Sequence, residues 1–131
     1  MNRRKFEALV RRALTGLPPE FASRIENVEI VIEDSPAEEH LEYAGLEPGD
    51  TLFGLYEGIP LTERTHDYNL VPPDKITIFR KPIEAECASE DEIAEEIRLT
   101  VMHEIAHYFG ISDEKMDEIE ARWYGAENDS H

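Results

Sequence analysis

The sequence has few of the features that would place the protein in a membrane or in an oxidising compartment. Cys87 is the only cysteine in 131 residues, so the chain can form neither an internal disulfide nor a thiolate zinc site. No apolar run approaches the roughly 20 residues of a membrane-spanning helix. The basic residues 3–5 are not followed by the continuous apolar stretch of a signal peptide. We therefore expect a cytoplasmic protein without a membrane partner.

Basic residues are also scarce. The chain has 13 Lys and Arg against 30 Asp and Glu, and its formal net charge is −17. This balance argues against a nucleic-acid partner, because a phosphate backbone is bound by a basic surface. The basic residues gather in the first twelve positions, whereas acids dominate after residue 84. The two ends either attract each other across the fold or present solvated helix faces.

Length and apolar periodicity predict one domain that spans residues 1–131. Hydrophobic residues make up 40% and charged residues 33% of the chain, which is typical of a globular protein. The pattern predicts, in order, a helix over 3–15, strands over 28–33, 51–57 and 75–80 with a short helix over 37–43 between the first two, a helix from Ser89 to about Phe109, and a helix from about Glu114 to Tyr124. This order indicates an α+β fold. We expect the strand over 75–80 to form the edge of the sheet.

The helix that follows Ser89 has clear end signals. Ser89 and Glu92 form the S-x-x-E pattern of a capping box, and Gly110 is placed to end the helix in a left-handed conformation. Most of this helix is expected to be buried through Ile93, Ile97, Val101, Met102, Ile105, Ala106, Tyr108 and Phe109. The last helix is expected to bury Met116, Ile119 and Trp123.

The same long helix carries the motif H-E-x-x-H over residues 103–107. Four residues are just over one helical turn, so His103 and His107 project from one face and can bind a single zinc ion. That face lies away from the apolar stripe of the helix. Glu104 is poorly placed as a ligand but can reach a zinc-bound water, which is the position of a general base.

The motif continues as H-E-x-x-H-x-x-G-x-x-D. A positive φ at Gly110 would turn the chain so that Asp113 returns toward the metal as a third ligand. Three protein ligands leave a fourth position for water, as a catalytic zinc requires. Asp113 has an alternative role as the N-cap of the last helix, and Ser112 competes for that position.

The other candidate residues are weaker. His40, His66 and His131 are interpreted as solvent-exposed residues of loops or the chain end. Tyr124 and His66 are the two candidates for a second oxyanion donor. We expect Met116 to belong to the core rather than to lie under the metal.

The motif over 103–113 resembles that of the zincin metallopeptidases, in particular the metzincin-like branch with Asp as third ligand. The whole chain resembles a small bacterial family of minimal zincin-like proteins; the matching segments are Gly16-Leu17-Pro18, Asn27-Val28, Gly54-Leu55-Tyr56, Gly58-Ile59-Pro60-Leu61 and Ile76-Thr77-Ile78-Phe79-Arg80. This resemblance implies a small twisted sheet of three to four strands, packed against the N-terminal helix and the motif helix, with a C-terminal helix. It also implies one Zn²⁺ per chain, with His103, His107 and Asp113 as ligands and Glu104 as base.

These observations lead to a hypothesis of a zinc metalloendopeptidase acting on a peptide or protein substrate. Zinc-bound water, deprotonated by Glu104, would attack the scissile carbonyl. An extended substrate could pair with an edge strand of the sheet. The alternative is a non-catalytic module that retains the zinc site for peptide binding or regulation. A metal-dependent ribonuclease is disfavoured by the acidic net charge and by Glu104.

Overall fold

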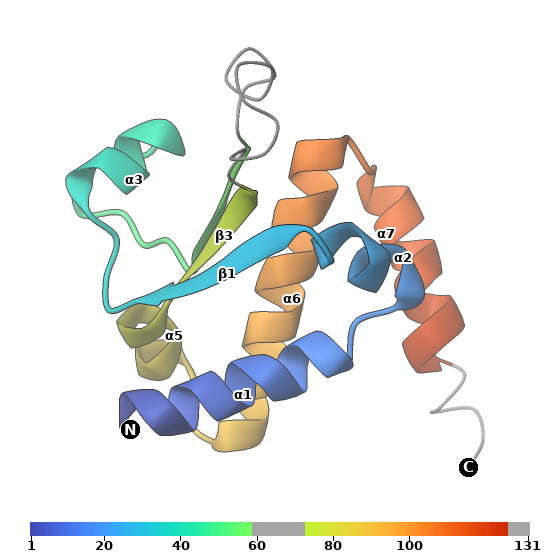
Figure 1. Cartoon of the computed structure of the whole chain (residues 1–131), viewed down its shortest axis with the longest axis horizontal. Helices are drawn as coiled ribbons and strands as arrows, with labels where there is room; N and C mark the ends of the chain where they lie inside the picture. Colours follow the sequence, from blue (N-terminus) through green and yellow to red (C-terminus); the bar gives the residue numbers. More distant parts are fainter. Residues whose placement is uncertain (59–72, 126–131) are drawn as a thin grey trace.

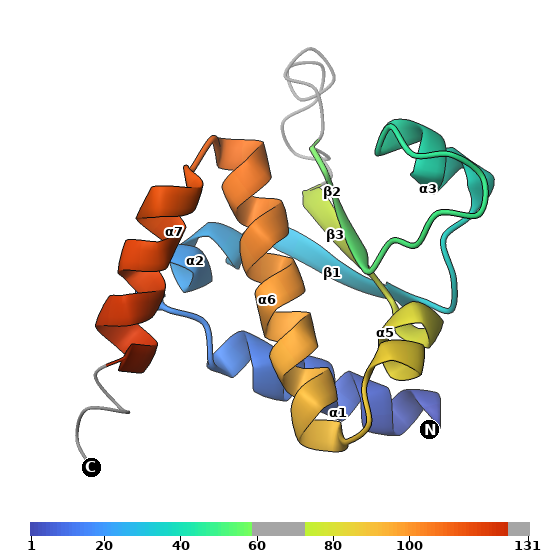
Figure 2. The ribbon, with the colours of Figure 1, turned by 180° about the vertical axis from the view of Figure 1, so that it is seen from behind.

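The structure is a computed structural model that describes residues 1–58 and 73–125 (Figure 1). A three-stranded sheet lies at its centre. It consists of β1 (Val28–Glu33), β2 (Gly54–Glu57) and β3 (Asp74–Phe79). Helices α1 and α6 cover one face of the sheet (Figures 1 and 2). The arrangement confirms the predicted α+β, zincin-like fold.

The strand order is β1-β3-β2, with β1 parallel and β2 antiparallel to β3. The expectation that residues 75–80 form an edge was therefore wrong, because β3 is the central strand. A sheet of this order has two edges, β1 on one side and β2 on the other. Alternation of side chains cannot reveal this order, because it reports which face a residue occupies and not which strand lies beside it.

The two helices that cover the sheet agree with the sequence analysis. Helix α1 (Arg3–Thr15) begins after Asn2, whose side chain accepts a hydrogen bond from the Lys5 N–H. Helix α6 (Glu90–Phe109) begins after Ser89, whose hydroxyl accepts from the Glu92 N–H at 3.2 Å. It ends at Gly110, which adopts the left-handed conformation with φ of 70°. These caps satisfy backbone groups that a helix leaves unpaired at its ends.

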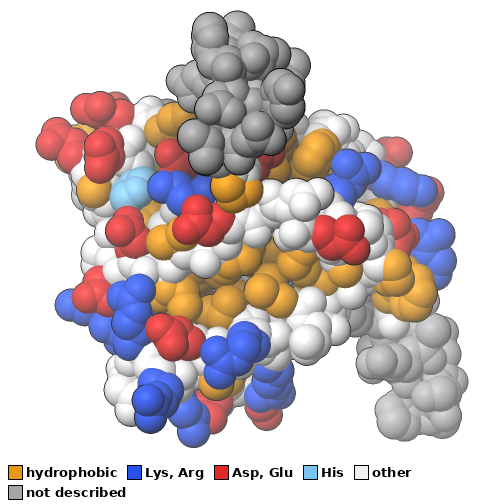
Figure 3. Space-filling view, in the orientation of Figure 1, with side chains coloured by type: hydrophobic (Ala, Val, Ile, Leu, Met, Phe, Trp, Pro, Cys, Tyr) orange, Lys and Arg blue, Asp and Glu red, His pale blue; other side chains and the backbone are white. Residues whose placement is uncertain are grey.

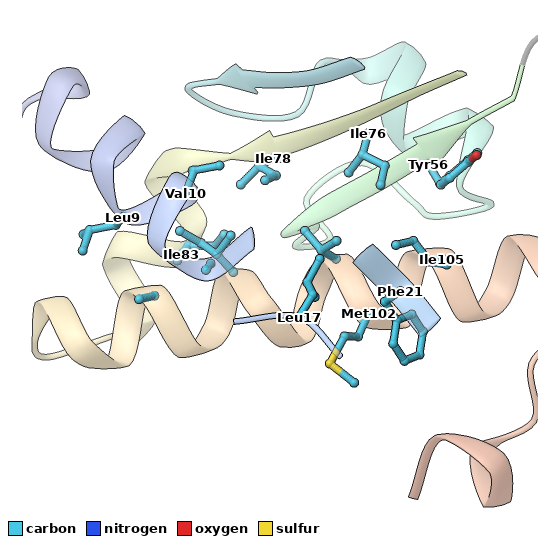
Figure 4. Packing of buried hydrophobic residues seen from close by; sticks show 14 of the residues in the cluster. Leu9, Val10, Leu17, Phe21, Tyr56, Ile76, Ile78, Ile83, Met102 and Ile105 are labelled. Atoms are coloured by element: carbon cyan, nitrogen blue, oxygen red, sulfur yellow. The ribbon is translucent and has the colours of Figure 1, made fainter. Parts of the chain in front are cut away.

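The core lies between this face of the sheet and the two helices (Figure 4). Ile76 and Ile78 of β3 point toward α6 and are fully buried. The buried face of α6 is made by Ile93, Ala94, Ile97, Val101, Met102, Ile105 and Ala106. Full burial of a side chain of this size is worth roughly 1.5–3 kcal/mol. Helix α6 is therefore fixed by its packing, and residues on its opposite face are held in place without contributing to the core.

Shorter helices complete the described part of the chain. They are α2 (Pro19–Ala22), the 3₁₀ turn η1 (Ser23–Ile25), α3 (Glu38–Tyr43), α5 (Arg80–Glu86), α7 (Asp113–Glu120) and the π-helical turn η2 (Ala121–Gly125). Helix α5 was not predicted, because Pro82 was interpreted as a stop after β3. Pro82 is the third residue of α5, and the first turn of a helix tolerates proline since its N–H groups have no partner within the helix.

Several side chains differ from their predicted environments. Tyr108, Phe109 and Trp123 were expected in the core, yet they are 47%, 43% and 42% exposed. The Trp123 indole N–H donates to the Glu20 carboxylate at 3.1 Å. His40 was expected in solvent, but it belongs to α3, accepts a hydrogen bond from the Ala37 N–H and packs edge-on against Phe79.

The basic start of the chain contacts the acidic start of α6. Lys5 pairs with Glu90 at 3.2 Å and Arg12 pairs with Asp91 at 2.8 Å. Of the two alternatives, contact between the two ends is therefore present, although these groups are exposed and each pair contributes little. Among the described residues, no helix combines the length and apolar character needed to cross a bilayer.

Strand β2 approaches α6 so closely that Gly54 has no room for a side chain. A Cβ at this position would lie 2.6 Å from Thr100 Cγ2 and 3.2 Å from the Thr77 carbonyl oxygen. We predict that Gly54→Ala lowers the free energy of unfolding by about 1–3 kcal/mol, as overpacking does elsewhere. Adding Thr100→Ala should restore part of this loss in urea denaturation. A double-mutant cycle without coupling between the two positions would contradict the close approach.

Candidate active site

The motif histidines lie on the side of α6 that faces away from the core. His103 and His107 are exposed, whereas their neighbours Met102, Ile105 and Ala106 are fully buried. The spacing of four residues places the two imidazoles one turn apart on the same face, as predicted. Helix α6 lies against the sheet (Figure 2) and buries the face opposite the histidines, so it presents both rings from a fixed support.

Both histidines line a cavity of about 500 Å³ beside the β2 edge of the sheet. Its walls come from the segment over 51–54, from α5 and from α6. The lining residues are Thr51, Leu52, Phe53, Gly54, Glu86, Glu96, Leu99, Thr100, His103, Glu104 and His107. All three residues of the predicted H-E-x-x-H site therefore border one open space.

Glu104 is half-buried and is held by the edge strand. The backbone N–H of Tyr56 in β2 donates to Glu104 Oε1 at 2.9 Å. Burial raises the pKa of the Glu104 carboxyl above its ordinary value, while the Tyr56 hydrogen bond and the nearby imidazoles of His107 and His103 oppose this rise. A carboxyl with a raised pKa accepts a proton more readily than an exposed glutamate does, which suits a general base.

Tyr56 is itself fixed by aromatic and polar contacts. Its ring stacks on that of Tyr108 at a centroid distance of 4.1 Å, and its hydroxyl donates to the Asp74 carboxylate at 2.7 Å. Gly58 permits the position of Tyr108, because a Cβ there would lie 2.2 Å from the tyrosine hydroxyl. These contacts hold the N–H that orients Glu104.

The end of the cavity toward the start of α6 is acidic. Glu86 of α5 and Glu96 of α6 line it, and within the described residues no lysine or arginine forms an ion pair with either carboxylate. Burial raises the pKa of Glu96; His103 opposes this rise, and the carboxylates of Glu86 and Glu95 add to it. This end of the cavity therefore favours positively charged groups.

Asp113 does not join the histidines. It is the first residue of α7 and is exposed. Ser112 is the N-cap, since its hydroxyl accepts a hydrogen bond from the Lys115 N–H at 3.1 Å. The alternative of Asp113 as N-cap was wrong, and its competitor Ser112 has that role. Among residues 1–58 and 73–125, no three His, Cys, Asp or Glu side chains are close enough together to hold a metal ion.

The remaining candidate residues have varied outcomes. Met116 is buried in the core cluster, as expected. His66, His131 and the side chain of Tyr124 lie outside the described part of the structure.

Sequence reasoning missed Tyr56, Glu86 and Glu96, because their positions at the site depend on tertiary contacts between β2, α5 and α6. Only Glu96 carried a signal, as it precedes His103 by seven residues, or about two helical turns.

The donor set fits a zinc ion in part. Imidazole nitrogen is a common zinc donor, and His103 and His107 offer two such groups on one face beside an open cavity. A carboxylate from Asp113 would complete a three-ligand set if α7 moved toward α6. Gly110, Ile111 and Ser112 connect the two helices.

Comparison with known proteins identifies a family for this chain. A family model for zincin-like metallopeptidases matches residues 25–123, which include the whole sheet, α6 and α7. No curated protein matches the chain. The matched region contains every residue of the cavity wall.

The half-buried Glu104 carboxyl makes stability depend on pH. Its ordinary pKa is 4.5 and the folded protein raises it, so ionisation opposes folding once the pH exceeds about that value. We predict that metal-free Glu104→Gln has a larger free energy of unfolding than the metal-free parent at pH 7, by at most about 1 kcal/mol after solvent screening. Its Tm should be higher by a few degrees. The difference should disappear at pH 4. Melting curves in the presence of a chelator would test this, and an advantage independent of pH would contradict it.

Proposed function

The chain belongs to the zincin-like metallopeptidase family, and on this basis we propose that it is a zinc-dependent endopeptidase whose general base is Glu104. The observation that carries the proposal is the position of Glu104. Its carboxylate lies beside the cavity that His103 and His107 also line, and the Tyr56 N–H holds it at 2.9 Å. A base, two metal donors and a space for substrate thus share one face of α6.

Glu104 would move the proton in both halves of the reaction. It would accept a proton from the water that attacks the scissile carbonyl and then deliver it to the amine that leaves. Its raised pKa favours the first step, and its partial burial limits competing contact with solvent. The Tyr56 N–H would keep one carboxylate oxygen fixed, which leaves the other to receive the proton.

His103, His107 and Asp113 would hold the zinc ion, one per chain. When bound, zinc supplies a Lewis acid that makes water acidic near neutral pH and polarises a carbonyl. Asp113 stands at the start of α7, three residues beyond Gly110. Its participation therefore requires α7 to approach α6, and the left-handed Gly110 is the residue best suited to change conformation at this joint.

The substrate would be a peptide segment bound in extended form. Strand β2 forms one edge of the sheet and borders the cavity, so a substrate strand could add to it. The carboxylates of Glu86 and Glu96 favour lysine or arginine near the cleaved bond. Assay peptides should therefore carry basic residues, with acidic peptides for comparison.

Replacement of the base separates catalysis from metal binding. We predict that Glu104→Gln retains about one zinc per chain and cleaves peptides at least about 100-fold more slowly than the parent. Glutamine preserves the acceptor for the Tyr56 N–H but cannot take up the proton. Metal content by mass spectrometry and peptide cleavage by liquid chromatography would be measured on the same samples.

Two other results would contradict this proposal. Equal cleavage by the parent and by Glu104→Gln would exclude Glu104 as the base. A parent that binds zinc and peptide but cleaves nothing would instead support the non-catalytic peptide-binding module. Glu114→Gln, an exposed change on α7 with the same loss of charge, serves as the matched control.

Adjacent residues distinguish a zinc ligand from a helix cap. We predict that Asp113→Ala loses most of its zinc, whereas Ser112→Ala keeps its zinc and loses about 1 kcal/mol of stability with the N-cap. Both proteins would be loaded with one equivalent of zinc and dialysed before metal analysis. If Asp113→Ala retains as much zinc as Ser112→Ala, Asp113 is not a ligand.

A further inference from the structure

A second surface lies on the opposite edge of the sheet, between β1 and α1. It is a groove of about 420 Å³ whose floor is apolar and includes Val10, Leu14, Ile30 and Ile32. Figure 3 shows an apolar patch between these two elements. Apolar patches of this kind on a soluble protein commonly mark a binding surface.

The groove runs beside an unpaired strand edge. Strand β1 pairs only with β3 among the described strands, so its other side presents backbone groups without a strand partner. Alternate residues of a parallel strand direct their N–H and C=O to the same side. The Ile32 carbonyl accepts a hydrogen bond from Arg3 and therefore faces away from β3. The backbone groups of Ile30 face the same way and are available to an added strand.

The rim of the groove is basic, in contrast to the molecule as a whole. Arg3 and Arg11 of α1 border it, and its one acid, Glu7, pairs with Arg3 at 3.6 Å. Arg11 is exposed and has no ion-pair partner within the described residues. The acids of β1, Glu29 and Glu33, alternate with Ile30 and Ile32 and so project from the other face of the sheet. At physiological salt the Debye length is about 8 Å, so a bound peptide experiences this rim rather than the net charge.

We propose that this groove binds an extended acidic segment of a partner protein, which adds to β1 as a further strand. Arg3 and Arg11 are eight helical residues apart, or about 12 Å along α1. A strand covers this distance in about four residues. The segment therefore carries two acidic residues at positions i and i+4, which face the two arginines, and an apolar residue at i+2, which enters the groove.

A second copy of this chain is a poorer occupant. Antiparallel pairing of two β1 strands centred on Val31 would place Glu29 of one copy opposite Glu33 of the other, and like charges in that position destabilise a sheet. The charge of −17 on each copy opposes association further. The groove is also remote from His103 and His107, since it lies at β1 and the cavity borders β2. Binding there is independent of zinc and of catalysis.

The test uses a defined peptide and a pair of adjacent arginines. The probe is the fluorescein-labelled peptide Thr-Asp-Thr-Val-Thr-Asp-Thr, titrated with the full chain and followed by fluorescence anisotropy. Arg11→Gln should weaken binding by about two- to fivefold, which is the range for one exposed charge pair. Arg12→Gln is the matched control, because Arg12 lies on the other flank of α1 and pairs with Asp91. It should bind the probe as the parent does.

Two modified peptides separate charge from strand pairing. The version with Asn in place of both Asp should bind the parent more weakly than the acidic peptide does. It should also bind the parent and Arg11→Gln with equal affinity, because it has no charge for Arg11 to contact. A version with N-methylated amides at alternate residues should lose binding, because it cannot pair with β1.

The proposal is overturned if no peptide binds at millimolar protein, if Arg12→Gln weakens binding as much as Arg11→Gln, or if the N-methylated peptide binds as tightly as the unmodified one. A dimer in sedimentation that Arg11→Gln dissociates would assign the groove to a second copy instead.

Discussion

The hydrogen bond from the Tyr56 N–H to Glu104 joins the edge of the sheet to the motif helix, and the arrangement of the site depends on it. It requires β2 to lie almost in contact with α6, which in turn requires Gly54 opposite Thr100. It also requires Tyr56 to be held by Tyr108 and Asp74. Without this contact Glu104 would be one of many exposed glutamates, and its pKa would not be raised by burial.

Local signals predicted the elements that carry the site. The hydroxyl of Ser89, the left-handed Gly110 and the apolar stripe of α6 act within one helix, so they are visible in the sequence before any tertiary contact exists. The same is true of His103 and His107, whose common face follows from helical spacing alone. The family resemblance agrees with these residues, and the match over residues 25–123 is consistent with it.

Tertiary relations were not predictable in the same way. The order of the strands, and hence which strand borders the cavity, depends on pairing between residues far apart in the chain. Pro82 is compatible both with the end of a strand and with the first turn of a helix, and only the structure distinguishes the two. Tyr108 and Trp123 have apolar bodies that fit a core pattern, yet Tyr108 stacks over Tyr56 and Trp123 bonds to Glu20.

The joint at Gly110 also bears on how tightly a metal could be held. The two histidines belong to α6 and Asp113 belongs to α7, which begins three residues beyond the glycine; both helices bury side chains in the core. If the complete ligand set forms only when α7 swings inward, the measured affinity is the intrinsic affinity multiplied by the fraction of molecules in that closed state. A protein closed one time in a hundred would bind about 100-fold more weakly than its ligands allow. Any partner or substrate that draws α7 inward would then act as a positive effector of metal loading.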